Sequence, residues 1–290
     1  MRIVDAHTHW YPDFVSADPA GWARAAAEPH WGAVAGPRAD GKRSLQGFPS
    51  IDKFLRDMDS AGVERAVIQG WYWENPANAR LMNREVARAV AAHPDRLSAF
   101  ASANPADSSW PEILREAADA GFCGIGELHS GVQGFRFASG AFSDFCGACA
   151  GEGLAVCLHL DDPRGKPYPN KVGTDNPGAF AAARANPMTK FIFAHWGGGE
   201  VFEPGFEPPE NVFYDTAANT FLYGAGAWKN CSGRLADKMI YGSDYPLRLY
   251  PRKSRAEEMD GFSGEAMANV PPESAAGFFS ENFDRLMGGL

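Results

Sequence analysis

The chain begins with an apolar run that ends in two histidines, Arg2-Ile-Val-Asp-Ala-His-Thr-His9. Alternate side chains of a β-strand point to the same face, so the imidazoles of His7 and His9 can face one interior. Clustered histidines of this kind bind metal ions. An open, doubly wound sheet usually has a glycine-rich nucleotide-binding turn after its first strand. Because this chain has a histidine pair there instead, the stretch favours a closed barrel.

Seven further apolar runs follow, with amphipathic segments between them. We expect strands at Arg2–His9, Arg65–Gly70, Leu97–Ala103, Gly124–Leu128, Ala155–Leu160, Lys190–His195, Val212–Ala217 and Lys238–Ser243. We expect helices at Ile51–Ala61, Ala77–Ala92, Trp110–Ala120, Phe142–Ala150 and Gly178–Ala185. Near-continuous apolar runs are typical of parallel strands buried on both faces. The alternation predicts an α/β fold, a single (β/α)8 TIM barrel over residues 1–290.

Three long segments without clear periodicity, 11–49, 161–177 and 245–272, follow expected strands. They therefore lie at the C-terminal face of the barrel, where barrel enzymes build their sites. Plain connections are shorter than the first of them. We expect these segments to form long βα loops that shape a substrate pocket.

The composition excludes several classes of function. The formal net charge of −9 argues against a nucleic-acid partner, which would need clustered Lys and Arg. No stretch approaches the roughly 20 apolar residues of a membrane span, and the N-terminus has no signal-peptide core. Five cysteines are an odd number in a chain too large to need disulfides. We expect a cytoplasmic protein that acts on a small molecule, and self-association into a homo-oligomer stays open.

Polar residues stand at the ends of further expected strands, where core packing gives them no reason to gather. They are Glu127 in Gly-Ile-Gly-Glu, His159 in Ala-Val-Cys-Leu-His, His195 in Phe-Ile-Phe-Ala-His and Asp244 in Met-Ile-Tyr-Gly-Ser-Asp. The C-terminal strand ends form the catalytic face of a barrel, so we expect these side chains to meet the first histidine pair. Three histidines and one aspartate suit zinc and leave a coordination position for water.

In this order the motifs resemble the amidohydrolase superfamily, in particular its amidohydrolase-related (amidohydrolase 2) branch. The resemblance runs from Asp5-Ala-His-Thr-His9 through Ala194-His-Trp-Gly-Gly-Gly199 to Gly242-Ser-Asp-Tyr-Pro246. The ending Ser280-Glu-Asn-Phe-Asp-Arg-Leu-Met287 resembles the closing helix of the branch. The branch contains lactone and amide hydrolases as well as zinc-dependent nonoxidative decarboxylases of aromatic and related acids.

The resemblance implies a role for each strand-end residue. It makes metal ligands of His7, His9, His159 and Asp244, and it makes His195 the catalytic histidine. Glu127 departs from many decarboxylases of the branch, which carry no carboxylate there. Hydrolases such as the TatD-like nucleases use a glutamate at this strand as a metal ligand. Glu127 could therefore ligate a metal, orient a ligand or pair with an arginine.

We therefore expect a metal-dependent hydrolase that cleaves a lactone, ester or amide through metal-activated water. Asp244 would carry the water proton, and His195 would stabilise the oxyanion. The alternative is a zinc-dependent nonoxidative decarboxylase; a non-enzymatic metal-binding scaffold has no use for His195. The cofactor would be a divalent metal, Zn²⁺ first, with one ion or two. Residues that could hold a substrate carboxylate are Arg164, Lys166, Tyr168, Asn170 and Arg248.

Overall fold

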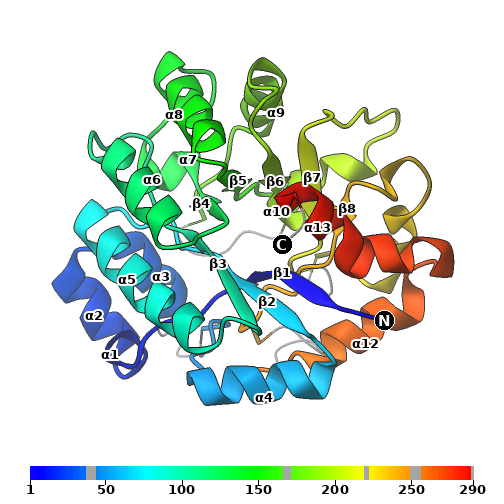
Figure 1. The fold of residues 1–290 in the computed structure, drawn as a ribbon, viewed down its shortest axis with the longest axis horizontal. Coiled ribbons are helices and arrows are strands. Elements are labelled where there is room, and N and C mark those ends of the chain that lie inside the picture. Colours follow the sequence, from blue (N-terminus) through cyan, green and yellow to red (C-terminus); the bar gives the residue numbers. More distant parts are fainter. Residues whose placement is uncertain (37–43, 166–170, 219–221, 249–255, 289–290) are drawn as a thin grey trace.

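Eight parallel strands form one sheet in the order of the sequence (Figure 1). The computed structural model describes residues 1–36, 44–165, 171–218, 222–248 and 256–288. The strands are β1 (Val4–Thr8), β2 (Arg65–Ile68), β3 (Leu97–Ala101), β4 (Gly124–Leu128), β5 (Ala155–Leu158), β6 (Phe191–Phe193), β7 (Val212–Asp215) and β8 (Met239–Ile240). Each lies within an expected strand, so the predicted barrel is confirmed.

The two ends of the sheet meet beside the first histidine pair. The N–H of Ala6 donates to the carbonyl of Tyr241 at 2.9 Å, and the N–H of Asp244 donates to the carbonyl of His7 at 2.9 Å. These bonds join β1 to the chain just after β8. A closed sheet leaves no edge, and its C-terminal strand ends surround one space.

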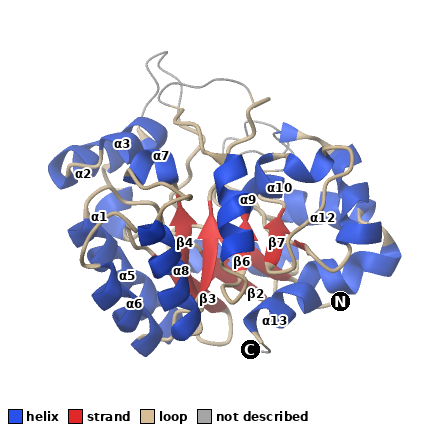
Figure 2. Cartoon of the chain, turned by 90° about the horizontal axis from the view of Figure 1, so that it is seen from above, coloured by secondary structure: helices blue, strands red, loops and turns tan. Residues whose placement is uncertain are grey.

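Helices surround the strands (Figures 1 and 2). Those that follow strands β1–β5 and β8 are α4 (Ile51–Ala61), α5 (Pro76–Ala92), α6 (Trp110–Asp119), α8 (Gly140–Gly151), α9 (Asn176–Ala185), α12 (Asp260–Asn269) and α13 (Asn282–Met287). Short turns are α7 (Ser130–Gln133), α10 (Ala194–Gly198), η1 (Glu200–Phe202), η2 (Ala225–Cys231), η3 (Gly233–Leu235), η4 (Pro272–Ser274) and η5 (Gly277–Glu281). The five expected helices are confirmed within two residues at each end. Among the described residues, no helix is both long enough and apolar enough to cross a membrane.

We expected the connection between β1 and α4 to be an irregular loop, but the structure has helices there. It contains α1 (Asp13–Ser16), α2 (Pro19–Ala26) and α3 (Pro29–Ala35). Helices of this length span about one to two turns, which is too short for an apolar period of 3.6 residues to be detected in the sequence. Their buried side chains, among them Tyr11 and Trp31, pack with Trp71 and Trp73 from the loop after β2. The connection is therefore a small second core over the C-terminal face.

Candidate metal centre

The predicted site residues meet at the C-terminal ends of five strands. They are His7 in β1 and His9 just after it, Glu127 in β4, His159 after β5, His195 after β6 and Asp244 after β8. His7 is fully buried, Glu127 is 2 % exposed and Asp244 is 4 % exposed. Buried charges require partners or metal ions. The strand-end prediction is therefore correct about which side chains come together.

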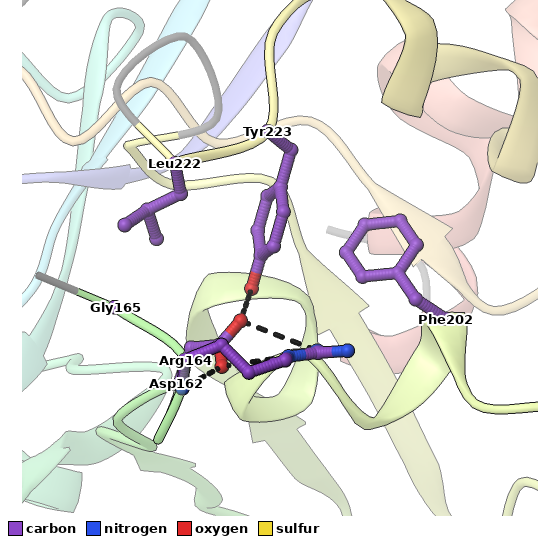
Figure 3. A pocket seen from close by; sticks show the side chains of 6 residues that line it. All are labelled: Asp162, Arg164, Gly165, Phe202, Leu222 and Tyr223. Carbon is purple, nitrogen blue, oxygen red and sulfur yellow. Dashed lines mark hydrogen bonds and ion pairs between the residues drawn. The ribbon is translucent and has the colours of Figure 1, made fainter.

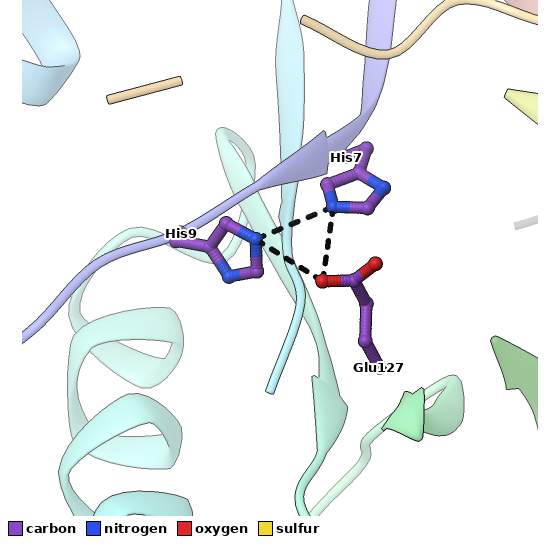
Figure 4. A group of neighbouring side chains, drawn as sticks. All are labelled: His7, His9 and Glu127. Atoms are coloured by element: carbon purple, nitrogen blue, oxygen red, sulfur yellow. Dashed lines mark hydrogen bonds and ion pairs between the residues drawn. The ribbon is translucent and has the colours of Figure 1, made fainter. Parts of the chain in front are cut away.

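One half of the cluster is formed by His7 and His9 at the end of β1 and Glu127 of β4 (Figure 4), with Asp244 after β8 beside them. The Nε2 atoms of His7 and His9 lie 3.3 Å apart. Oε2 of Glu127 lies 3.6 Å from the first of these nitrogens and 3.5 Å from the second. Oδ1 of Asp244 lies 3.8 and 3.5 Å from the same two atoms. His7, His9 and Glu127 therefore offer three donor atoms to one point, and Asp244 lies beside the two histidines.

The other half is formed by β4, β5 and β6. Oε1 of Glu127 lies 3.0 Å from Nδ1 of His159 and 3.5 Å from Nε2 of His195. The two histidine nitrogens are 3.1 Å apart. Glu127 thus turns one oxygen toward each histidine pair. In this arrangement His195 stands where a metal ligand would stand, although the resemblance gives it a catalytic role.

Unusual backbone geometry directs the side chains of His195 and Glu127 into the cluster. His195 has φ 56° and Trp196 has φ 59°, so the chain turns left-handed directly after β6. Such φ values are uncommon for residues other than glycine and occur at functional sites. At Gly126, a Cβ atom would meet the carbonyl oxygen of Cys157 at 2.4 Å. Glycine therefore lets β4 approach β5 closely just before Glu127.

Asp215 at the end of β7 is a site residue that the sequence analysis missed. Its Oδ2 lies 2.7 Å from Nδ1 of His7, while its Oδ1 accepts the N–H of His195 at 2.9 Å. A carboxylate on one ring nitrogen fixes the imidazole so that the other nitrogen is offered to a metal. The available signal was one aspartate that ends the otherwise apolar run Val212-Phe-Tyr-Asp215.

Two further histidines lie closer to the site than expected. The ring of His129 stacks on that of His159 at 5.0 Å, with an interplanar angle of 13°. His30 is only partly exposed, and its ring lies 6.1 Å from that of His129. It lies in α3, which brings its ring to 5.6 Å from that of Tyr72 in the loop after β2.

The electrostatics of the cluster favour a cation. Burial opposes a charge on His7, but the carboxylates of Asp215 and Glu127 raise its pKa well above the usual value. Burial likewise opposes a charge on His159, yet Glu127 and Asp161 raise its pKa to about 10. The same histidines hold the pKa of Glu127 well below its usual range despite burial. Carboxylates that draw protons onto histidines offer the same attraction to a divalent cation, and the nitrogen and oxygen donors suit one.

The predicted substrate-binding arginines are engaged within the fold. Arg164 donates to Oδ1 of Asp162 at 3.0 Å, to Glu203 at 2.9 Å and to the carbonyl of Gly199 at 2.9 Å. Arg248 donates to the carbonyl of Ser44. Lys166, Tyr168 and Asn170 lie outside the described residues. No contact with a substrate tests these predictions.

Two cavities open near the loops rather than at the cluster itself. One of about 330 Å³ is lined by Asp162, Arg164, Gly165, Phe202, Leu222 and Tyr223, and the hydroxyl of Tyr223 donates to Asp162 at 2.7 Å (Figure 3). The other, of about 290 Å³, is lined by Pro29, His30, Ala33, Lys171 and Val172. Neither cavity is lined by a residue of the metal cluster, so the side-chain geometry rather than cavity size identifies the site.

The sequence pattern of the family described as amidohydrolase matches residues 4–288. The chain belongs to the amidohydrolase family. A search of curated proteins found no match to this amidohydrolase. The family membership agrees with the resemblance inferred from the histidine motifs.

Solved structures with the same barrel cover nearly the whole amidohydrolase chain. A 2,6-dihydroxybenzoate decarboxylase from Rhizobium has a TM-score of 0.68 and 18% identity, and 99% of each chain is covered. A 5-carboxyvanillate decarboxylase from Sphingomonas paucimobilis has a TM-score of 0.70 and 17% identity, covering 100% of this chain and 99% of its own. A dihydroxybenzoic acid decarboxylase from Polaromonas sp. JS666, with manganese and 2-nitroresorcinol bound, has a TM-score of 0.68 and 16% identity, covering 99% of this chain and 97% of its own.

Proposed function

We propose that this amidohydrolase is a metal-dependent enzyme that removes the carboxyl group of an aromatic acid without an oxidant. The observation that carries the proposal is an aromatic wall beside the cation-type cluster. Trp71 and Tyr72 follow β2, and their rings stack with centroids 4.2 Å apart. The Trp71 ring lies 5.7 Å from that of His9, and the Tyr72 ring lies 5.4 Å from that of His159. A planar substrate could stack here with its carboxyl group toward the cluster.

The barrel relatives support this choice. Those described above are named as decarboxylases of dihydroxybenzoates or of carboxyvanillate. The hydrolase that we expected first from the sequence has less support from these comparisons than its alternative.

An extra carboxylate such as Glu127 would by itself oppose decarboxylation, because it adds negative charge to the site. Its position between the two histidine pairs removes this difficulty. A substrate carboxylate, and the negative charge left on the ring, need positive charge nearby. Glu127 turns one oxygen to each histidine pair, an arrangement that suits two divalent cations. Two such cations outweigh the two carboxylates of the cluster, whereas a single cation is only neutralised by them. We propose two ions, Zn²⁺ or Mn²⁺, which when bound supply the positive charge that binds and polarises the substrate.

Asp244 is the residue that we assign to proton transfer. Its Oδ1 faces His9 Nε2 at 3.5 Å, and its Oδ2 lies 3.9 Å from Nδ1 of His195. The ring carbon gains a proton as the carboxyl group leaves as carbon dioxide. Burial raises the pKa of Asp244, but His9 and His7 hold it below its usual value, so Asp244 is ionised and would pass on a proton that it takes up from solvent. Trp71 and Tyr72 would orient the ring and exclude water from it.

Hydrolysis is the second candidate, and the same Glu127 favours it. A carboxylate between two cation positions also serves attack by water on a lactone, ester or amide. In that reaction Asp244 would accept the proton of the water, and solvent oxygen would enter the product. The two candidates therefore share a site but differ in the atoms gained from solvent.

An isotope experiment with the metal-loaded protein separates them. Hydroxylated benzoates labelled with carbon-13 at the carboxyl group, and lactones, esters and amides, are incubated in water enriched in oxygen-18 and, in parallel, in deuterated water. We expect labelled carbon dioxide and a product that carries one solvent-derived hydrogen on the ring. Solvent oxygen in a cleaved lactone, ester or amide, without release of carbon dioxide from any acid, would replace the proposal with hydrolysis. Asp244→Asn is expected to lower turnover by roughly 10²–10⁴-fold, the range for lost acid–base catalysis.

A further inference from the structure

A carboxylate outside the cluster faces the far edge of His159. Nε2 of His159 lies 3.9 Å from Oδ1 of Asp161, on the side opposite its contact with Glu127. Nε2 of His129 lies 3.7 Å from the other oxygen, Oδ2. Because the two imidazoles are stacked, one carboxylate meets the edges of both rings.

The backbone of Asp161 is held from both sides. Its N–H donates to the hydroxyl oxygen of Thr174 at 2.8 Å, and its carbonyl accepts the side-chain amide of Asn176 at 2.9 Å. These two partners are joined to each other at 2.7 Å. The carboxylate is therefore fixed relative to β5 by the chain that leads into α9. Its Oδ2 is buried and forms no hydrogen bond within the described residues.

His129 is oriented independently of the carboxylate. Its Nδ1 accepts the N–H of Val132 at 3.4 Å, at the first turn of α7. A neutral imidazole that accepts at one nitrogen carries its proton on the other. The Nε2–H of His129 is therefore directed toward Asp161, and the ring supports the flat face of His159.

We propose that Asp161 is a positioning residue that holds the proton of His159 on Nε2 and so leaves Nδ1 free for a cation. The inference rests on the proposed two-cation centre and concerns its Glu127–His159–His195 half. Asp215 acts on His7 in the same way in the other half, at a shorter distance. Each half of the centre then has its own carboxylate–histidine pair, and such partners change metal affinity about 10–100-fold.

The test titrates Zn²⁺ into metal-free protein against a chromophoric chelator. Wild-type protein is expected to show two binding steps. Asp161→Ala is expected to weaken one step by roughly 10–100-fold and to leave the other unchanged. Asp161→Asn keeps one acceptor oxygen, so its loss should fall between wild type and Asp161→Ala.

The neighbouring residue supplies the matched control. Asp162 is bound to Arg164 and Tyr223 rather than to a histidine of the cluster. Asp162→Asn is therefore expected to keep both zinc steps at wild-type strength. His159→Ala should abolish the step that Asp161→Ala weakens, because both changes act on the same half.

Three results would overturn the inference. One is two unchanged zinc steps in Asp161→Ala; another is equal weakening of both steps, the pattern of a general structural defect. The third is a further zinc ion in wild-type protein that His129→Ala and Asp161→Ala both lose, since these residues and His159 are spaced closely enough to hold an ion themselves. The titration needs no turnover, so failure of the proposed decarboxylation would leave its outcome readable.

Discussion

His7 lies among three carboxylates that serve two different purposes. Asp215 contacts its Nδ1 at 2.7 Å, whereas Glu127 and Asp244 face its Nε2 at 3.6 and 3.8 Å. The short contact is a hydrogen bond, while the longer separations leave room for a cation among the donor atoms. The imidazole of His7 thus contacts a buried carboxylate with one nitrogen and faces the candidate metal centre with the other.

Asp215→Asn tests whether the hydrogen bond to Asp215 orients the imidazole of His7. The amide replaces the acceptor of the Nδ1 proton with a neutral group, so zinc affinity should fall by about 10–100-fold. Asp237→Asn is the control, because its side chain is exposed in the turn before β8. Equal zinc affinity in the two variants, measured by chelator competition, would show that Asp215 does not orient His7.

The sequence predicted which side chains at the strand ends come together, but not the residues that contact them from behind. Histidines at strand ends stand out because core packing rarely needs them. Asp215 is an ordinary acidic residue in the sequence, and only the closed barrel brings it against His7. Asp161 lies two residues after His159, but its contact with that ring depends on how the chain turns after β5. Spacing along the chain could not reveal contacts made between different strands and loops.

At the scale of elements, the β1–α4 connection is fixed to the start of α5 by one buried carboxylate. Glu28 accepts the N–H groups of Glu74 and Asn75 at 2.8 and 3.0 Å and the side-chain amide of Asn78 at 2.7 Å. Glu28 is 1 % exposed. The residue precedes α3, so these bonds place that helix over the C-terminal face.

Glu28→Ala should loosen this connection without unfolding the barrel. It leaves buried donors without a partner, which costs about 1–3 kcal/mol. Hydrogen exchange is expected to rise in α2 and α3, and KM should rise more than kcat falls, because the catalytic groups stay in place. Asp18→Ala is the control, since Asp18 only accepts the N–H of Gly21 within its own helix. Unaltered exchange in α3 of the Glu28 variant would contradict the assigned role.

Helix prediction succeeded where the apolar period is clear. It missed the short helices α1–α3 and also α12 (Asp260–Asn269), which lies in the segment 245–272 that we expected to be a long loop. α4 and α5 have several turns, enough for the apolar period to be visible, and Ser50 and Gly62 cap α4. α1, α2 and α3 are shorter, and their stability comes from packing against Trp71 and Trp73 after β2. That packing is a tertiary property, so the sequence shows only aromatic residues without a period.

For the whole molecule, the barrel followed from the number of apolar runs and the polar residues that end them. Closure between β1 and the chain after β8 is what turns separate motifs into one centre. The reaction was harder to predict, because Glu127 suggested hydrolysis when it was counted as a lone negative charge. The structure instead sets it between two histidine pairs, so in the two-cation centre that we propose its charge would be shared by both ions.

The most direct test of this account is a crystal structure of the manganese-loaded protein with anomalous diffraction measured at the manganese edge. We predict two anomalous peaks, one beside His7, His9 and Asp244 and the other beside His159 and His195, each next to one oxygen of Glu127. A single peak that Glu127 does not contact, or no peak among these residues, would contradict the account.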